Sequence, residues 1–193
     1  MKNYKSKILL ATLFIVAMMG LQSCDDSKTE DTKDVAEEHN NAKFEDNKNE
    51  KDAQFLVDAA VIHRQEISLG KLAQQKGTTN HVKELGKMME VDHTKALAEL
   101  TTMAKTKNIS LPTAQTDNGQ DAYNKLNQKS GNDFGKEFSN MMVDGHKDAI
   151  ALFEKASTDC SDLEIKAWAA SLLSALRTHL DHSLVCQKEC SKM

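Results

Sequence analysis

One carboxylate and three imidazoles stand out because they lie among apolar residues. Glu66, His93, His146 and His179 each fall on or beside the apolar face of a different predicted helix, since the residues around them recur with the helical period. Burying such groups without a partner costs free energy. We therefore expect these side chains to face one another, water or an ion.

The depth of these residues along their helices can be compared by counting. Glu66 lies about 12 residues before the first helical hairpin and His93 about 14 residues after it, so at ~1.5 Å per residue both fall in one layer. His146 lies near the middle of its helix and joins this layer. His179 lies a turn or more from the middle of its helix and fits less well. The expected group is therefore Glu66, His93 and His146.

A short motif indicates which ion such a group would hold. Glu90 and His93 form a Glu-x-x-His pattern, which di-iron helical bundles use on two helices together with further glutamates. Only half of that pattern is present here, so oxygen-activating di-iron chemistry is disfavoured. A mononuclear zinc, copper or iron site remains, with Glu90 and His179 as further candidate ligands and Asp92 orienting an imidazole. The alternative is a buried hydrogen-bond network that only fixes helix register.

A second stripe of candidate ligands lies near the end of the chain. His182, Cys186 and Cys190 follow at helical spacing and so share one helix face. Imidazole and thiolate ligands suit Cu(I) or zinc. The alternative is a local disulfide between the two cysteines beside an exposed histidine.

The elements that position these residues are predicted to be helices. A single proline, few aromatic residues and the helical period favour an all-α fold. Four long helices are expected, at residues 52–76, 79–106, 132–157 and 161–188. The connection 108–130, with a short helix near 121–128, is long enough to run the length of a ~40 Å bundle. This predicts a ferritin-like four-helix bundle whose second and third helices are parallel, with a plain up-and-down bundle as the alternative.

The first 51 residues are predicted to lie outside this bundle. Three lysines, a short apolar run and small residues before Cys24 are typical of a secretory signal peptide over residues 1–23. The residues that end at Cys24 also resemble the lipobox of bacterial lipoproteins, in which the cysteine is lipidated. Residues 24–51 are charged and nearly free of large apolar side chains, which predicts a flexible acidic tether. The bundle would then occupy residues 52–190, anchored to a membrane.

The net charge of the chain limits the classes of molecule that it could bind. The chain has 25 Lys and Arg and 29 Asp and Glu, and removing residues 1–23 with their three lysines leaves 22 against 29, a net charge of −7 with histidine neutral. Nucleic-acid binding needs a basic face and is therefore excluded. The sequence also lacks a Gly-rich phosphate loop and a nucleophile-elbow motif, and it indicates no partner protein.

Several segments resemble the family called domain of unknown function 4142. They include 66–73 (EISLGKLA), 89–94 (MEVDHT), 145–149 (GHKDA) and 176–180 (LRTHL). The resemblance implies an exported bacterial envelope protein with a ferritin-like helical bundle. It also implies that five positions are shared with the family motif, namely Glu66, Asp92, His93, His146 and His179. It implies no activity.

Together these features predict a lipid-anchored cell-envelope protein at the outer membrane, facing the periplasm or the cell surface. The first hypothesis is that it binds or responds to a metal through the inward Glu/His layer. The second is a structural or interaction module whose polar layer only sets helix register. A redox enzyme is the third hypothesis, and the missing glutamates weigh against it.

Overall fold

The computed structural model describes residues 30–44 and 47–192, and these form six helices and no strand. The chain is thus all-α over this part, as predicted. Cys24 and the expected signal peptide lie outside the described residues. Among the described helices, none is long and apolar enough to cross a membrane. The helices are α1 (Thr32–Lys43), α2 (Asn47–Lys76), α3 (Asn80–Lys107), α4 (Asp117–Asn127), α5 (Gly131–Asp159) and α6 (Leu163–Ser191).

The four long helices α2, α3, α5 and α6 lie close to the predicted ranges, and their ends follow from local chemistry. The Thr79 hydroxyl caps α3 by accepting from the Val82 amide, and the Asp162 carboxylate caps α6 by accepting from the first turn. Asn108 ends α3 in the left-handed region with a φ of 55°, a conformation that asparagine tolerates. Of the two shorter helices in the described ranges, α4 overlaps the short helix expected near 121–128, whereas α1 was not predicted.

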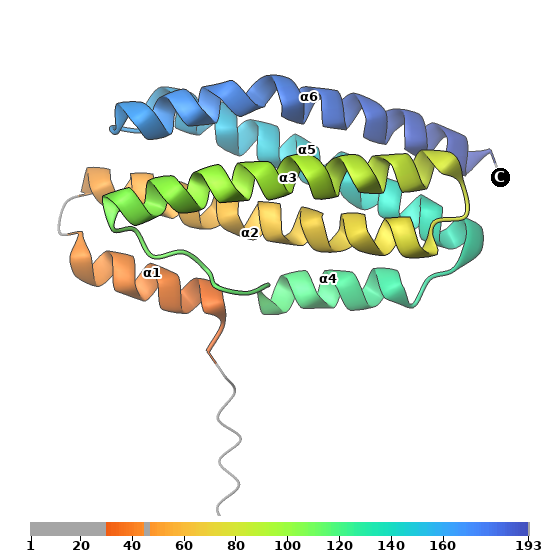
Figure 1. Cartoon of the computed structure of the whole chain (residues 1–193), viewed down its shortest axis with the longest axis horizontal. Helices are drawn as coiled ribbons and strands as arrows, with labels where there is room; N and C mark the ends of the chain where they lie inside the picture. Colours follow the sequence, from red (N-terminus) through yellow and green to blue (C-terminus); the bar gives the residue numbers. More distant parts are fainter. Residues whose placement is uncertain (1–29, 45–46, 193) are drawn as a thin grey trace, which may run out of the picture.

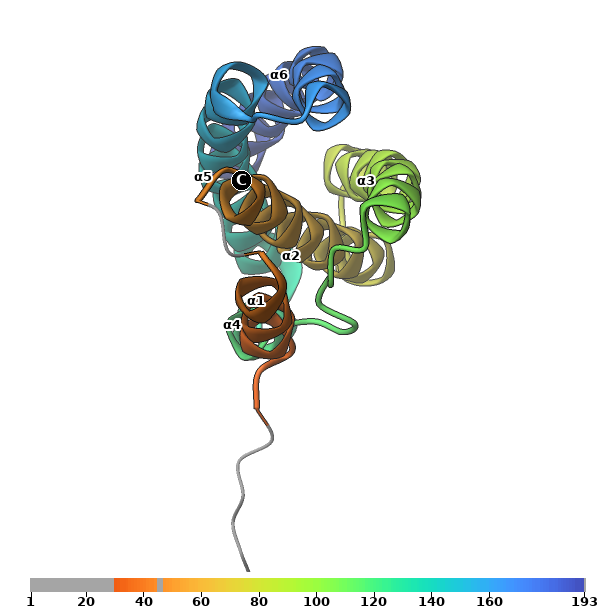
Figure 2. The ribbon, with the colours of Figure 1, turned by 90° about the vertical axis from the view of Figure 1, so that its left-hand side faces the viewer.

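The connection between α3 and α5 runs back along the whole molecule. In Figure 1 this connection leaves one end of α3, continues through α4 and enters α5 at the opposite end, so α3 and α5 run in the same direction. Figure 2 shows the long helices end-on, with α2 beside α3 and α5 beside α6. This is the course that a crossover connection requires.

The N-terminal segment differs from the prediction. A flexible tether over residues 24–51 is wrong for residues 32–43, which form α1, and α2 already begins at Asn47. The Asn40 side chain donates to the Ser110 carbonyl at 2.9 Å and accepts from the Ser110 amide at 2.8 Å. The Asp31 carboxylate caps α1 and also accepts from the Asp117 amide at the start of α4. Polar side chains thus hold α1 against the crossover connection without a large apolar face.

The hydrophobic core is divided into two clusters by a polar layer. One cluster contains Phe55, Phe153 and Trp168, with the Phe55 and Phe153 ring centroids 5.1 Å apart. The other contains Met89 and Phe138. Along each long helix the residues between the two clusters include buried polar groups, which are His63, Glu66, His93, His146, His179 and Ser183. The interior therefore places its titratable side chains in the middle of the apolar core.

Helices α2 and α3 approach closely through two glycines. A Cβ atom at Gly70 would lie 2.6 Å from the Gly86 carbonyl oxygen, and one at Gly86 would lie 2.7 Å from the Gly70 carbonyl oxygen. These are backbone contacts, so a flexible side chain cannot relieve them. The two glycines thus set the distance between α2 and α3, just beyond the polar layer.

We expect Gly70→Ala to lower the free energy of unfolding by about 1–3 kcal/mol, because the added methyl group forces α2 and α3 apart. Alanine has the higher helix propensity by about 1 kcal/mol, so a gain would be expected without the clash. Urea unfolding followed by circular dichroism measures the change. Ser174→Ala on the exposed face of α6 is the control and stays at or slightly above wild type. A Gly70→Ala protein as stable as wild type would contradict this packing.

Candidate metal centre

Four histidines from four different helices meet in the polar layer. His63 lies on α2, His93 on α3, His146 on α5 and His179 on α6, and each is at most 3% exposed. Neighbouring ring centroids are 5.1–5.6 Å apart. The helical pairs α2–α3 and α5–α6 each contribute one histidine pair, so the packing of the long helices assembles the group.

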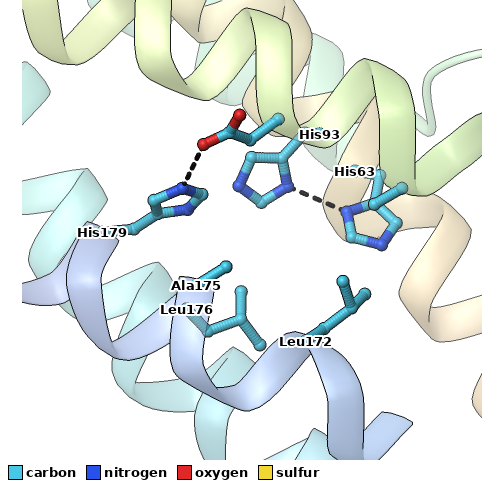
Figure 3. Close-up of a pocket in the computed structure, with 8 residues that line it drawn as sticks. His63, His93, Leu172, Ala175, Leu176 and His179 are labelled. Atoms are coloured by element: carbon cyan, nitrogen blue, oxygen red, sulfur yellow. Dashed lines mark hydrogen bonds and ion pairs between the residues drawn. The ribbon is translucent and has the colours of Figure 1, made fainter. Parts of the chain in front are cut away.

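The pair from α2 and α3 shares one proton. The Nδ1 atoms of His63 and His93 are 2.8 Å apart, so one donates to the other (Figure 3). The Nε2 atoms of both rings are buried and have no hydrogen-bond partner. An unpaired buried nitrogen costs about 1–3 kcal/mol. Two such atoms in one layer indicate that the protein interior alone does not complete this arrangement.

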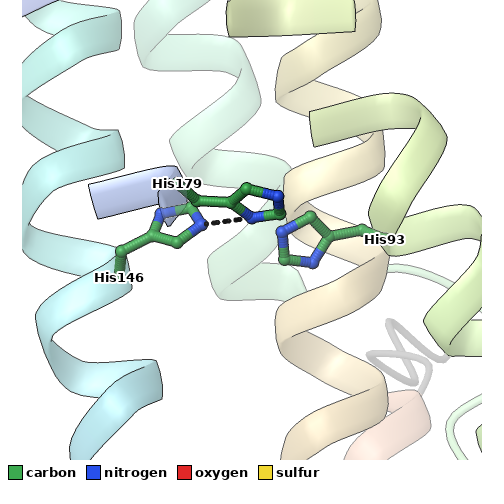
Figure 4. A group of neighbouring side chains, drawn as sticks. All are labelled: His93, His146 and His179. Carbon is green, nitrogen blue, oxygen red and sulfur yellow. Dashed lines mark hydrogen bonds between the residues drawn. The ribbon is translucent and has the colours of Figure 1, made fainter. Parts of the chain in front are cut away.

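The pair from α5 and α6 brings two acceptor nitrogens face to face. His146 Nδ1 lies 2.9 Å from the Met142 carbonyl oxygen, which only accepts, so Nδ1 carries the proton. His179 Nε2 lies 2.9 Å from the Asp92 carboxylate and carries its proton for the same reason. In the neutral rings, the remaining atoms, His146 Nε2 and His179 Nδ1, therefore both present lone pairs, 3.3 Å apart (Figure 4). Only a proton or a cation between them makes this contact favourable.

The separation of these two nitrogens matches metal coordination. Two nitrogen ligands at about 2.0–2.1 Å from a tetrahedral ion are about 3.3–3.4 Å apart. His93 supplies a third nitrogen, and one ligand atom from each of His93, His146 and His179 lies within 4.8 Å of the others. Figure 4 shows the three rings directed toward a common point. These three nitrogens are therefore the ones that could hold an ion together.

The electrostatics keep these rings neutral, which is the form that binds metal. Burial lowers the pKa of His63 to about 3 and that of His146 to about 4. Burial and the neighbouring histidines hold the pKa of His93 well below its ordinary value. Burial also lowers the pKa of His179, although the Asp92 carboxylate opposes this. Protons are therefore poor competitors for the lone pairs at neutral pH.

Neither predicted glutamate belongs to the group of ligand atoms that lie within 4.8 Å of one another. Glu66 is buried and its Oε1 approaches Gly145, with 3.1 Å to the position of a Cβ there, while its Oε2 has no partner. Burial raises the pKa of Glu66 to about 8, so the group is mostly protonated at neutral pH. Glu90 faces α2, where it accepts from the Gln74 side chain at 2.6 Å. Of the expected group, the structure brings His93 and His146 together with His179, while His63 contacts His93 and Asp92 contacts His179.

His63 was missed, although the sequence held a signal for it. It lies 15 positions before residue 78, the middle of the α2–α3 hairpin, and His93 lies 15 positions after it. Equal distance from a tight hairpin places two residues at the same level. Glu66, three residues later on the same face, is nearly one turn away. His179, which seemed too far from the middle of its helix, joins the group.

The stripe of His182, Cys186 and Cys190 does not converge on one point. Cys186 and Cys190 are free thiols buried in the second apolar cluster, so the alternative of a disulfide between them is not formed here. His182 is exposed on α6. The Cys190 sulfur lies 3.0 Å from the position of a Cβ at Gly135, so that glycine makes room for it. These cysteines serve as apolar packing in this structure.

Comparison with known proteins places the chain in a family. The model of the family described as "Domain of unknown function (DUF4142)" matches residues 36–184. The chain belongs to the DUF4142 family. This confirms the resemblance seen in the sequence, and the matched range includes all four histidines and most of α1.

A solved structure of CopM in the Cu(I)-bound form resembles this DUF4142 chain in fold. The TM-score is 0.60 at 18% sequence identity, and the match covers 72% of this chain and 96% of CopM. At this identity the likeness shows a shared fold. No curated protein matches the sequence.

We expect the metal-free protein to lose stability as the pH falls from 6.5 toward 4. The folded state keeps His146 neutral down to a pKa of about 4, whereas the unfolded chain binds a proton near 6.5. Each such histidine costs about 1.4 kcal/mol of unfolding free energy per pH unit in this window. Protonation of Glu66 contributes to the pH dependence of stability with the opposite sign. Because it is a single group, it only partly offsets the loss caused by the histidines. Urea unfolding at pH 7, 6 and 5 measures the slope, which the exposed-site variant His182→Ala retains; a flat profile would contradict the prediction.

A second pH dependence arises from Glu66. Its folded pKa of about 8 exceeds the ordinary value of 4.5, so the folded state holds an extra proton and stability falls as the pH rises between these values. From pH 6.5 to 8 the expected loss is about 2 kcal/mol. Glu66→Gln removes this loss, whereas Glu90→Gln retains it. Identical profiles for the wild type and Glu66→Gln would show that Glu66 is ionised in the folded protein.

Proposed function

We propose that this DUF4142 protein binds a transition metal, copper first, through His93, His146 and His179. Asp92 orients His179 from outside the coordination sphere, and His63 does the same for His93. The observation that carries the proposal is the 3.3 Å contact between His146 Nε2 and His179 Nδ1, each with its proton fixed on the far side of the ring. A metal ion turns this repulsive contact into two coordination bonds.

The donor set favours copper. Imidazole nitrogen suits copper, zinc and iron, and among divalent ions of this series copper binds most tightly. Calcium and magnesium prefer a shell of about six or more oxygen ligands, whereas the ligand atoms that lie together here are imidazole nitrogens. A di-iron centre lacks the bridging glutamates, since Glu66 faces Gly145 and Glu90 faces Gln74. The shared fold with CopM, a protein solved with Cu(I), also supports copper over zinc or iron.

The alternative is a layer that only sets helix register, and the unpaired nitrogens weigh against it. A structural network stabilises a protein when every member is satisfied. Here the Nε2 atoms of His63 and His93 have no partner, and two lone pairs face each other across α5 and α6. A purely structural role would retain these costs without compensation.

The location of the protein is part of the same proposal. Lipidation at Cys24 would anchor it in the cell envelope, at the outer membrane facing the periplasm or the cell surface. The basic start, apolar run and lipobox-like residues support this. We further propose that α2, α3, α5 and α6 form a four-helix bundle of the ferritin-like kind, which the course of the α3–α5 connection supports. No protein partner is assigned.

We expect the untagged wild-type protein to bind one more equivalent of copper than the His93→Ala/His146→Ala double variant. Elemental analysis after dialysis against copper measures the difference. The control is His81→Ala/His182→Ala, which removes two exposed histidines and keeps the wild-type content. Copper at 100 times its dissociation constant should also stabilise the wild type by about 2.7 kcal/mol and the double variant not at all. Equal copper content in the wild type and the double variant would refute the proposal. Tighter binding of zinc than of copper would retain the site but assign it to zinc.

A further inference from the structure

A small pocket opens beside the histidine cluster between α3 and α6. Its volume is about 30 Å³, and Figure 3 shows His63, His93 and His179 on one side of it and apolar residues of α6 on the other. It is lined by His63, Asp92, His93, Ala96, Leu172, Ala175, Leu176 and His179. Such a volume suits one or two water-sized groups and is far below the several hundred cubic ångströms of sites for organic substrates.

One residue of the pocket wall, His63, carries a buried polar atom without a hydrogen-bond partner. His63 is 1% exposed, and its Nε2 is buried without a partner. The proton position on this ring follows from the metal site. When His93 gives its Nε2 lone pair to an ion, its Nδ1 carries the proton and donates to His63 Nδ1 across 2.8 Å. His63 must then carry its own proton on Nε2, and it becomes a hydrogen-bond donor in the pocket wall.

We infer that this pocket is the exchangeable coordination position of the metal and takes a small anion of one to three atoms. The inference rests on the copper site proposed above. Three protein ligands leave the fourth position of a tetrahedral ion open, which is typical of sites that bind an exogenous ligand. The anion binds the metal at one end and accepts a hydrogen bond from His63 Nε2. His63 is thus a ligand-binding residue of the pocket.

Charge balance favours a monoanion. Three neutral imidazoles and the Asp92 carboxylate leave a Cu(II) ion with one uncompensated positive charge in a buried layer. Burial of an unpaired charge is costly, and one hydroxide, halide or azide removes it. The remaining pocket walls, Ala96, Leu172 and Leu176, are apolar and offer no competing charge.

The experiment uses the full chain loaded with Cu(II) and titrated with azide, whose charge-transfer absorption reports coordination. The variant Ala175→Leu adds bulk at an exposed residue of α6 that lines the pocket and changes no metal ligand. We expect wild-type copper content and at least about a tenfold loss of azide affinity. Ser174→Leu, at the adjacent exposed position, is the control and retains the wild-type copper content and azide affinity. Electron paramagnetic resonance on the same samples reports whether azide changes the copper environment.

His63→Phe tests the hydrogen bond. Phenylalanine suits this position, because the His63 ring centroid lies 6.0 Å from that of Phe153 and 6.1 Å from that of Trp168. At saturating copper we expect azide affinity to fall about tenfold, the scale of a lost hydrogen bond to a charged group. Wild-type azide affinity in His63→Phe or in Ala175→Leu overturns the inference. If the wild-type protein binds copper but not azide, only the inference about the pocket is overturned. If it binds no copper, the proposed function is overturned as well.

Discussion

The interior is organised around two imidazole nitrogens that lie 3.3 Å apart, on rings whose other nitrogens each contact an oxygen acceptor. The protons are held on the opposite sides of the rings by the Met142 carbonyl and the Asp92 carboxylate. A backbone carbonyl within a helix is a rigid partner, so the tautomer of His146 is set by α5 itself. Binding of the proposed ion would then require no change of proton position in this pair, and the cost of organising the site would be met during folding.

The division of the apolar core explains how the fold tolerates such a layer. Aromatic residues on one side and Met89, Phe134 and Phe138 on the other form two clusters that bury most of the apolar surface. These clusters supply the driving force for folding, while the histidines between them contribute little and carry unpaired nitrogens. Proteins commonly accept a local loss of stability where a functional site is held.

The long helices and their inward histidines could be predicted because both follow from the spacing of apolar residues. His93, His146 and His179 lie on faces that this spacing identifies. Glu66 was chosen over His63 because residues three apart share a face, and only their level along the axis separates them. Composition did not predict α1, because this helix is held by side-chain hydrogen bonds such as those of Asn40. The positions of the protons on the histidine rings could not be predicted from the sequence, because they depend on hydrogen-bond partners from two helices.

The ordering of α1 changes how far the domain would reach from its anchor. Only the residues between Cys24 and Asp31 remain between the proposed lipidated cysteine and the cap of the first helix. Even fully extended, such a stretch spans about 25 Å. If Cys24 is lipidated as proposed, the helical domain would lie close to the bilayer surface.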